Sequence, residues 1–112
     1  MMTIKVCEYI PNAFSSDQAT VIRKVMEEVL SMNETITLDF EGIKRFTTLF
    51  FNFSTAAFIT KLGPDVYKNS VVIKNLSSLG QSTYENSYNN AIKKYSIKDQ
   101  ADILDILQNP ED

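Results

Sequence analysis

The fold of this chain is decided by residues 35–53, Thr-Ile-Thr-Leu-Asp-Phe-Glu-Gly-Ile-Lys-Arg-Phe-Thr-Thr-Leu-Phe-Phe-Asn-Phe. Apolar and polar residues alternate up to Asp39, which is typical of a strand with one buried face. A turn at Gly42 follows. Thr47 and Thr48 then precede an apolar run, where a threonine side chain can cap the first turn of a helix. The stretch therefore predicts a strand, a turn and a helix in direct succession.

The residues before this stretch predict another strand and another helix. Residues 3–10 are rich in β-branched and apolar side chains, which favours a strand that ends at Pro11. Ser15 and Gln18 have the spacing of a capping box, in which each side chain bonds the other residue's backbone N–H. Apolar residues recur at helical spacing from there to Met32. We expect the first helix to span this region.

The residues after the stretch continue the alternation. The second helix should end at Leu62-Gly63-Pro64, because glycine stops a helix and proline cannot continue one. A third strand is expected at residues 70–74, whose consecutive apolar side chains predict burial on both faces. Residues 77–95 predict a third helix and residues 98–108 a short last one, ended by the proline two residues further on.

The order of these elements is strand, helix, strand, helix, strand, helix, helix. Strands that alternate with helices form parallel sheets through right-handed crossovers. We therefore expect an α/β fold with a small, mostly parallel sheet and crossover helices. With 112 residues, 44% of them hydrophobic, the chain is large enough for one core. No repeat or linker divides it, so residues 1–112 are expected to form a single domain.

The composition argues against most enzyme classes. The chain has no histidine, which excludes imidazole acid–base chemistry and the commonest nucleophile–histidine arrangements. Its three glycines are too far apart for a dinucleotide-binding or phosphate-binding loop. The net charge of −3 argues against wrapping a nucleic-acid backbone. We expect a non-enzymatic protein without cofactor, metal site or nucleic-acid partner.

The sequence also bears on the compartment. No run of about 18 apolar residues is present, so no membrane association is expected. The one cysteine, Cys7, cannot form an intramolecular disulfide and fits a reducing cytoplasm. We expect Cys7 to be buried in the first strand rather than reactive.

Two adjoining segments resemble a known family. They are Leu-Asp-Phe-Glu-Gly-Ile at residues 38–43 and Lys-Arg-Phe-Thr-Thr at residues 44–48. With the order of elements, they resemble the STAS domain of bacterial anti-sigma-factor antagonists, and more closely its STAS-like branch. In the founding family, a Leu-Asp strand is followed by a hydrophobic turn and an Asp-Ser-Ser/Ala-Gly motif that opens the next helix. The resemblance covers about residues 3–107 and implies a STAS-like fold.

The resemblance also implies a regulatory role. In the family, the serine after the motif's aspartate is phosphorylated by a kinase-type ATPase of the GHKL class, and phosphorylation breaks the complex. On this chain the aspartate falls on Thr47, the phosphoserine on Thr48 and the glycine on Leu49 or Phe50. The acid and the glycine of the motif are thus replaced here. Thr48, with Thr47 beside it, is the candidate phospho-acceptor, and a plain helix cap is the alternative.

The second helix has apolar residues on two sides. Phe50 belongs to one side, with Leu49 and Phe53, whereas Phe51, Phe58 and Leu62 form a second stripe on roughly the opposite side. A surface helix needs only one apolar face. Either a neighbouring helix of the same chain covers the second stripe, or the stripe meets a regulatory protein or a second copy of the chain. The candidate partner-binding residues are Phe50, Phe51, Phe58 and Leu62.

Three functions remain in competition. The leading interpretation is a regulatory protein–protein interaction module that docks a partner through the start and one face of the second helix. The second is a small-ligand or nucleotide-binding domain. The resemblance implies this function, because STAS folds can bind nucleotides at the ends of their strands. Asp39 and Asn75 are then the candidate ligand-binding residues, with Thr47 and Thr48 nearby. The third is a phage or mobile-element inhibitor of a host protein.

Overall fold

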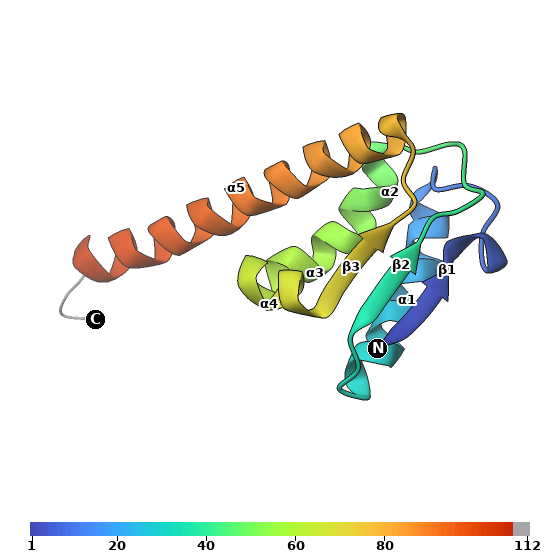
Figure 1. Ribbon diagram of the computed structural model, residues 1–112. Helices are drawn as coiled ribbons and strands as arrows, with labels where there is room; N and C mark the ends of the chain where they lie inside the picture. The colour runs from blue at the N-terminus through green and yellow to red at the C-terminus, as the bar shows by residue number, and fades with distance from the viewer. Residues whose placement is uncertain (109–112) are drawn as a thin grey trace.

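The computed structural model describes the backbone of residues 1–108 and the side chains of residues 1–96 (Figure 1). Its centre is a parallel sheet of three strands in the order β1-β2-β3. The strands are β1 (Met2–Lys5), β2 (Ile36–Asp39) and β3 (Val71–Lys74). The helices are α1 (Ser16–Ser31), α2 (Thr48–Phe53), α3 (Thr55–Leu62), α4 (Pro64–Ser70) and α5 (Ser78–Gln108). The predicted α/β class, parallel sheet and crossover helices are confirmed.

Helix α1 begins where its sequence predicts. The Ser15 hydroxyl oxygen accepts a hydrogen bond from the backbone N–H of Gln18 at 3.1 Å, and the Gln18 side chain accepts one from the N–H of Ser15 at 3.0 Å. This capping box satisfies two N–H groups that a helix start would otherwise leave unpaired. The buried face of α1, which includes Ile22 and Met26, packs into the core.

Helices cover only one face of the sheet in the described part of the chain. In Figure 1, α1, α2 and α3 lie behind the strands, while the face toward the viewer carries no helix. Val71 points to the covered face and is buried, whereas Val72 points the other way and is 45% exposed. The prediction that the third strand is buried on both faces is therefore wrong. Three consecutive apolar residues indicate a strand but not what covers each of its faces.

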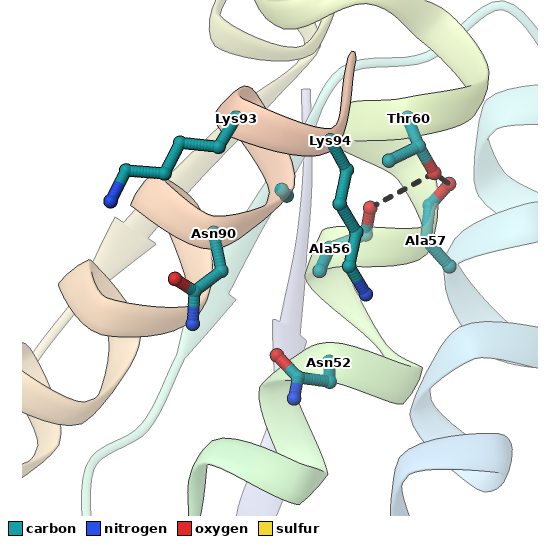
Figure 2. A pocket seen from close by; sticks show the side chains of 8 residues that line it. Asn52, Ala56, Ala57, Thr60, Asn90, Lys93 and Lys94 are labelled. Atoms are coloured by element: carbon teal, nitrogen blue, oxygen red, sulfur yellow. Dashed lines mark hydrogen bonds between the residues drawn. The ribbon is translucent and has the colours of Figure 1, made fainter. Parts of the chain in front are cut away.

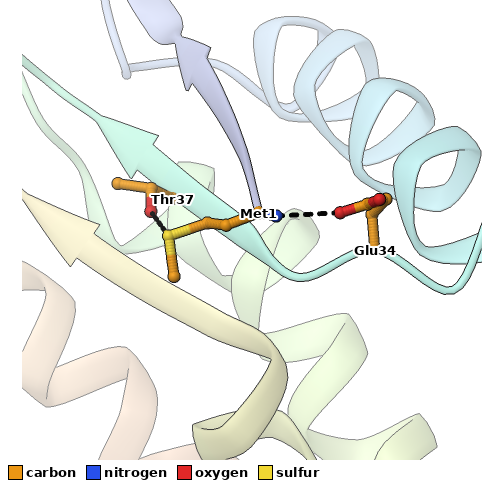
Figure 3. Close-up of polar contacts among 3 residues, drawn as sticks. All are labelled: Met1, Glu34 and Thr37. Atoms are coloured by element: carbon orange, nitrogen blue, oxygen red, sulfur yellow. Dashed lines mark hydrogen bonds and ion pairs between the residues drawn. The ribbon is translucent and has the colours of Figure 1, made fainter.

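One residue on the open face is buried by the start of the chain. The Thr37 hydroxyl donates to the Met1 sulfur at 3.1 Å, and the Met1 ammonium lies 2.9 Å from a carboxylate oxygen of Glu34 (Figure 3). Thr37 is only 5% exposed as a result, although its strand neighbours on this face, Thr3 and Val72, are exposed.

The first strand is shorter than predicted. It ends at Lys5, and the chain turns into a short 3₁₀-helix, Val6–Glu8. Val6 enters the core with an exposure of 0%, but Cys7 faces solvent. The expectation that Cys7 is a buried strand residue is therefore wrong, because the strand ends before it and Cys7 is on the exposed side, alternating with the buried Ile4 and Val6.

The second predicted helix consists of two helices that are broken at Ser54. The hydroxyl of Ser54 donates to the carbonyl of Phe50 at 2.8 Å, and that of Thr55 donates to the carbonyl of Phe51 at 3.4 Å. Such bonds from side chain to backbone, four residues back, bend helices. Two hydroxyl residues in succession thus account for the change of direction between α2 and α3.

The glycine stop at Gly63 is confirmed, but another helix follows it. Gly63 has a φ of 86°, in the left-handed region that glycine adopts readily. Pro64 then occupies the first position of α4, where its missing N–H costs nothing. The sequence reading recognised the end of one helix and missed the start of the next.

The last two predicted helices are one. Helix α5 runs without a break over the predicted boundary near residue 96, and it extends beyond the end of the sheet in Figure 1. The side chains of residues 97–108 lie outside the described residues, and the separate helix predicted at residues 98–108 falls within this range. No helix in the described part of the chain is both long enough and apolar enough to cross a membrane.

Candidate functional site

The start of α2 is held by a hydrogen-bonded threonine. Thr47 is the N-cap: its hydroxyl oxygen accepts from the N–H of Phe50 at 3.1 Å, and the same hydroxyl donates to the carbonyl of Phe14. Thr48 is the first residue of the helix and is half-buried. Of the two predicted phospho-acceptors, Thr47 is therefore engaged in capping. Within the described residues the hydroxyl of Thr48 makes no hydrogen bond.

The segment before α1 positions this helix start. The N–H of Ala13 donates to the carbonyl of Arg45 at 3.0 Å, and the N–H of Thr47 donates to the carbonyl of Ala13 at 3.0 Å. Phe14 therefore lies beside Thr47, far from it in sequence, and its side chain is 53% exposed. The start of α2 is therefore held in place by hydrogen bonds between the segment before α1 and the segment before α2.

Asp39 and Asn75 meet at the carboxyl ends of β2 and β3. The amide of Asn75 donates to the Asp39 carboxylate at 2.8 Å, and the N–H of Glu41 donates to the same oxygen at 3.0 Å. These two bonds, the first more than the second, lower the pKa of Asp39 below its ordinary value. Asn75 has a φ of 61°, a left-handed conformation that asparagine tolerates better than most residues.

The hydrogen bond from Asn75 to Asp39 leads to a prediction about stability in acid. A carboxyl group whose pKa falls on folding stabilises the fold above its unfolded pKa of about 3.9, and this contribution disappears as the pH drops through the folded pKa. Replacing Asn75 by glycine keeps the left-handed backbone accessible and removes the amide. We expect the pKa of Asp39 to rise in Asn75→Gly, measured by carbon-13 NMR titration of the carboxyl group.

Asn33→Gly is the matched control for this titration, because Asn33 also has a positive φ of 60°. It should leave the pKa of Asp39 unchanged. An equal rise in both variants would show that backbone change, rather than the lost amide contact, moves the pKa.

The sequence predicts one ligand site formed by Asp39 and Asn75 with Thr47 and Thr48 nearby. The structure does not bring these four residues together in one hollow. A small hollow of about 180 Å³ at the strand ends is lined by Lys5, Cys7, Glu8, Asp39 and Glu41. Neither Asn75 nor the threonines line it. Thr47 bonds instead to α2 and to the segment before α1. Among the described residues, no group of three or more histidine, cysteine or acidic side chains could hold a metal ion.

Three of the four predicted partner-binding residues lie in the core. Phe50 and Phe51 are 0% exposed and Phe58 is 3% exposed. The ring of Phe51 packs edge-on against that of Tyr84 on α5, with centroids 5.4 Å apart. Leu62 is partly buried against the same core. The prediction that the three phenylalanines dock a partner is therefore wrong, because all three are buried in the core and α5 covers Phe51.

The exposed apolar residues of α2 are different ones. Leu49 is 47% exposed and Phe53 is 46% exposed, and they are four residues apart on the same side of the helix. Together with Phe14, whose backbone carbonyl accepts a hydrogen bond from Thr47 at the start of the helix, we call them the docking patch. Leu49 and Phe53 thus take the exposed positions that the sequence pattern assigned to Phe50, Phe51 and Phe58. Their spacing was the available signal.

The fold and the α2 junction define a class of protein. A small parallel sheet, with helices on one face and a threonine-capped helix after the central strand, is consistent with a STAS-like fold. The family model described as a STAS-like domain of unknown function (DUF4325) matches residues 18–81, more than half of the chain. The chain belongs to this family. A search of curated proteins and a search of solved structures found no significant match.

Proposed function

We propose that this STAS-like domain is a non-enzymatic regulatory module that docks a partner protein at the start of α2. The observation that carries the proposal is the docking patch of Phe14, Leu49 and Phe53, each of which is 46% exposed or more. Large apolar and aromatic side chains that face solvent are frequent at the centre of protein interfaces. The buried phenylalanines beneath them hold the helix rigid, which lowers the entropic cost of binding.

Thr48 supplies the regulatory element of the proposal. It directly precedes Leu49, and its hydroxyl takes no part in the capping that occupies Thr47. A phosphate on Thr48 would add negative charge beside an apolar contact surface, and the desolvation of that charge would oppose docking. The partner is a regulatory protein with an apolar binding pocket, and a kinase-type ATPase is the class that the STAS resemblance favours.

The test is affinity capture of the tagged chain from its native cell, with the recovered proteins identified by mass spectrometry. We expect one specific partner in the wild type. Leu49→Ala and Phe53→Ala should each weaken its recovery about tenfold, because truncating a central apolar contact costs more than about 1 kcal/mol. Thr48→Glu should weaken it as well, through charge at the edge of the patch.

Leu79→Ala is the control, because Leu79 is also exposed, at 62%, but lies on the first turn of α5. It should leave the partner bound. Equal recovery with all variants, or equal loss with the control, would contradict docking at α2. Recovery of the chain itself as the patch-dependent partner would assign the surface to a homodimer instead.

A further inference from the structure

A hollow between two helical segments belongs to neither surface discussed above. It is a groove of about 440 Å³ between α2–α3 and α5 (Figure 2). Pockets of roughly 300–1,000 Å³ accommodate small organic ligands. Ala56 and Ala57 on one side and Ala91 on the other create the space, because each ends at its Cβ atom.

The polar side chains that line the groove are those of Asn52, Thr60, Asn90, Lys93 and Lys94. The amide oxygen of Asn52 accepts from the buried hydroxyl of Ser87 at 2.7 Å, which orients the amide and leaves its NH₂ group as a donor. Lys93 and Lys94 add two ammonium groups. In Figure 2 the side chain of Lys94 extends along the groove toward Asn52, whereas Lys93 points away to the other side of α5. The two donors that converge are therefore Lys94 and Asn52.

Charge distinguishes this groove from the hollow at the strand ends. The strand-end hollow is lined by the carboxyl side chains of Glu8, Asp39 and Glu41 with one lysine, and would repel an anion. Among the residues that the structure describes, no carboxylate lines the groove between α2–α3 and α5. The whole chain has a net charge of −3, whereas this groove is lined by two lysines and no acidic side chain and is therefore locally positive.

We propose that this groove binds a small organic phosphate, with Lys94 and the Asn52 amide holding the phosphate group. The alanine floor leaves room for the organic part of the ligand beside them. The proposal does not depend on partner docking at α2, and the failure of either would leave the other standing.

The test is NMR titration of the full-length, nitrogen-15-labelled chain with inorganic phosphate, adenosine 5′-monophosphate and neutral adenosine. The monophosphate should shift the amide signals of residues in the groove, with a dissociation constant of about 1 mM or tighter. Phosphate should shift a subset of them, and adenosine should shift none. Added salt should weaken binding, because the lysine is near the surface and its field is screened.

Two substitutions probe the groove by different means. Lys94→Gln removes the charge and should weaken monophosphate binding about tenfold, a typical loss for a charge-assisted contact. Ala57→Leu fills the space and should abolish binding with the charge intact. Lys24→Gln, at an exposed position on α1, is the matched control and should bind as the wild type does.

Three results would overturn the proposal. The first is the absence of shifts in the wild type at about 10 mM monophosphate, a concentration that detects even weak affinity. The second is binding that Lys94→Gln and Ala57→Leu leave unchanged. The third is binding of an acidic peptide such as hexaglutamate in the groove without binding of the monophosphate, which would assign the groove to a protein segment.

Discussion

Replacing Phe51 by alanine should lower the free energy of unfolding by about 3–5 kcal/mol, the range for deleting a buried aromatic side chain. Phe51 is 0% exposed, and its ring lies 5.3 Å from that of Phe50, 5.8 Å from that of Phe40 and 5.4 Å from that of Tyr84, centroid to centroid. The deletion removes contacts to both the sheet side and α5, so the cavity cannot close by moving one neighbour. Urea unfolding followed by circular dichroism measures the loss.

Phe53→Ala is the matched control, with the same side chain two residues further along α2. Because Phe53 is 46% exposed, its truncation should change the unfolding free energy by no more than about 0.5 kcal/mol. Losses of similar size in the two variants would contradict the assignment of Phe51 to the core. A stable Phe51→Ala chain that lost its partner would restore Phe51 as a docking residue.

Replacing Gly80 by alanine should destabilise the fold by about 1–3 kcal/mol, the usual cost of overpacking. A Cβ atom at this position would lie 2.9 Å from the ring of Phe46, too close for any ordinary contact. That ring is itself stacked on Phe51 at 6.2 Å between centroids and has little room to move. Thermal or urea unfolding of the variant measures the effect.

Whether Gly80→Ala lowers or raises the stability of the fold is informative. In a helix without close neighbours, glycine to alanine should stabilise by about 1 kcal/mol, because alanine has the higher helix propensity. Ser82→Ala, at an exposed position on the same helix, is the control and should stabilise slightly. Stabilisation by Gly80→Ala as well would show that α5 does not press against Phe46.

Local features of the fold could be predicted from sequence because few residues decide them. The capping box of Ser15 and Gln18, the cap at Thr47 and the stop at Gly63 each depend on contacts or dihedral angles within a few residues. The grouping of Asp39 with Asn75 was also predictable, because Asp39 ends β2, Asn75 follows β3, and neighbouring parallel strands end at the same edge.

The partner-binding residues could not be predicted in the same way. Periodicity placed Phe51 and Phe58 on a stripe but carried no information about what lies over that stripe. The answer depends on α5, which returns over α2 and places Tyr84 against Phe51. The break at Ser54 also shifts the faces of α3 relative to those of α2, so one helical wheel drawn through both helices was misleading.

The sequence by itself therefore determined the α/β class, the parallel direction of the strands, the caps of α1 and α2 and the STAS resemblance. All of these follow from short-range preferences and from the alternation of strand and helix. The tertiary structure decided which apolar side chains of α2 are buried, which face of the sheet stays open, and that Asn52 and Lys94 share a groove. These depend on long-range packing, in which residues far apart in the chain compete for the same surface.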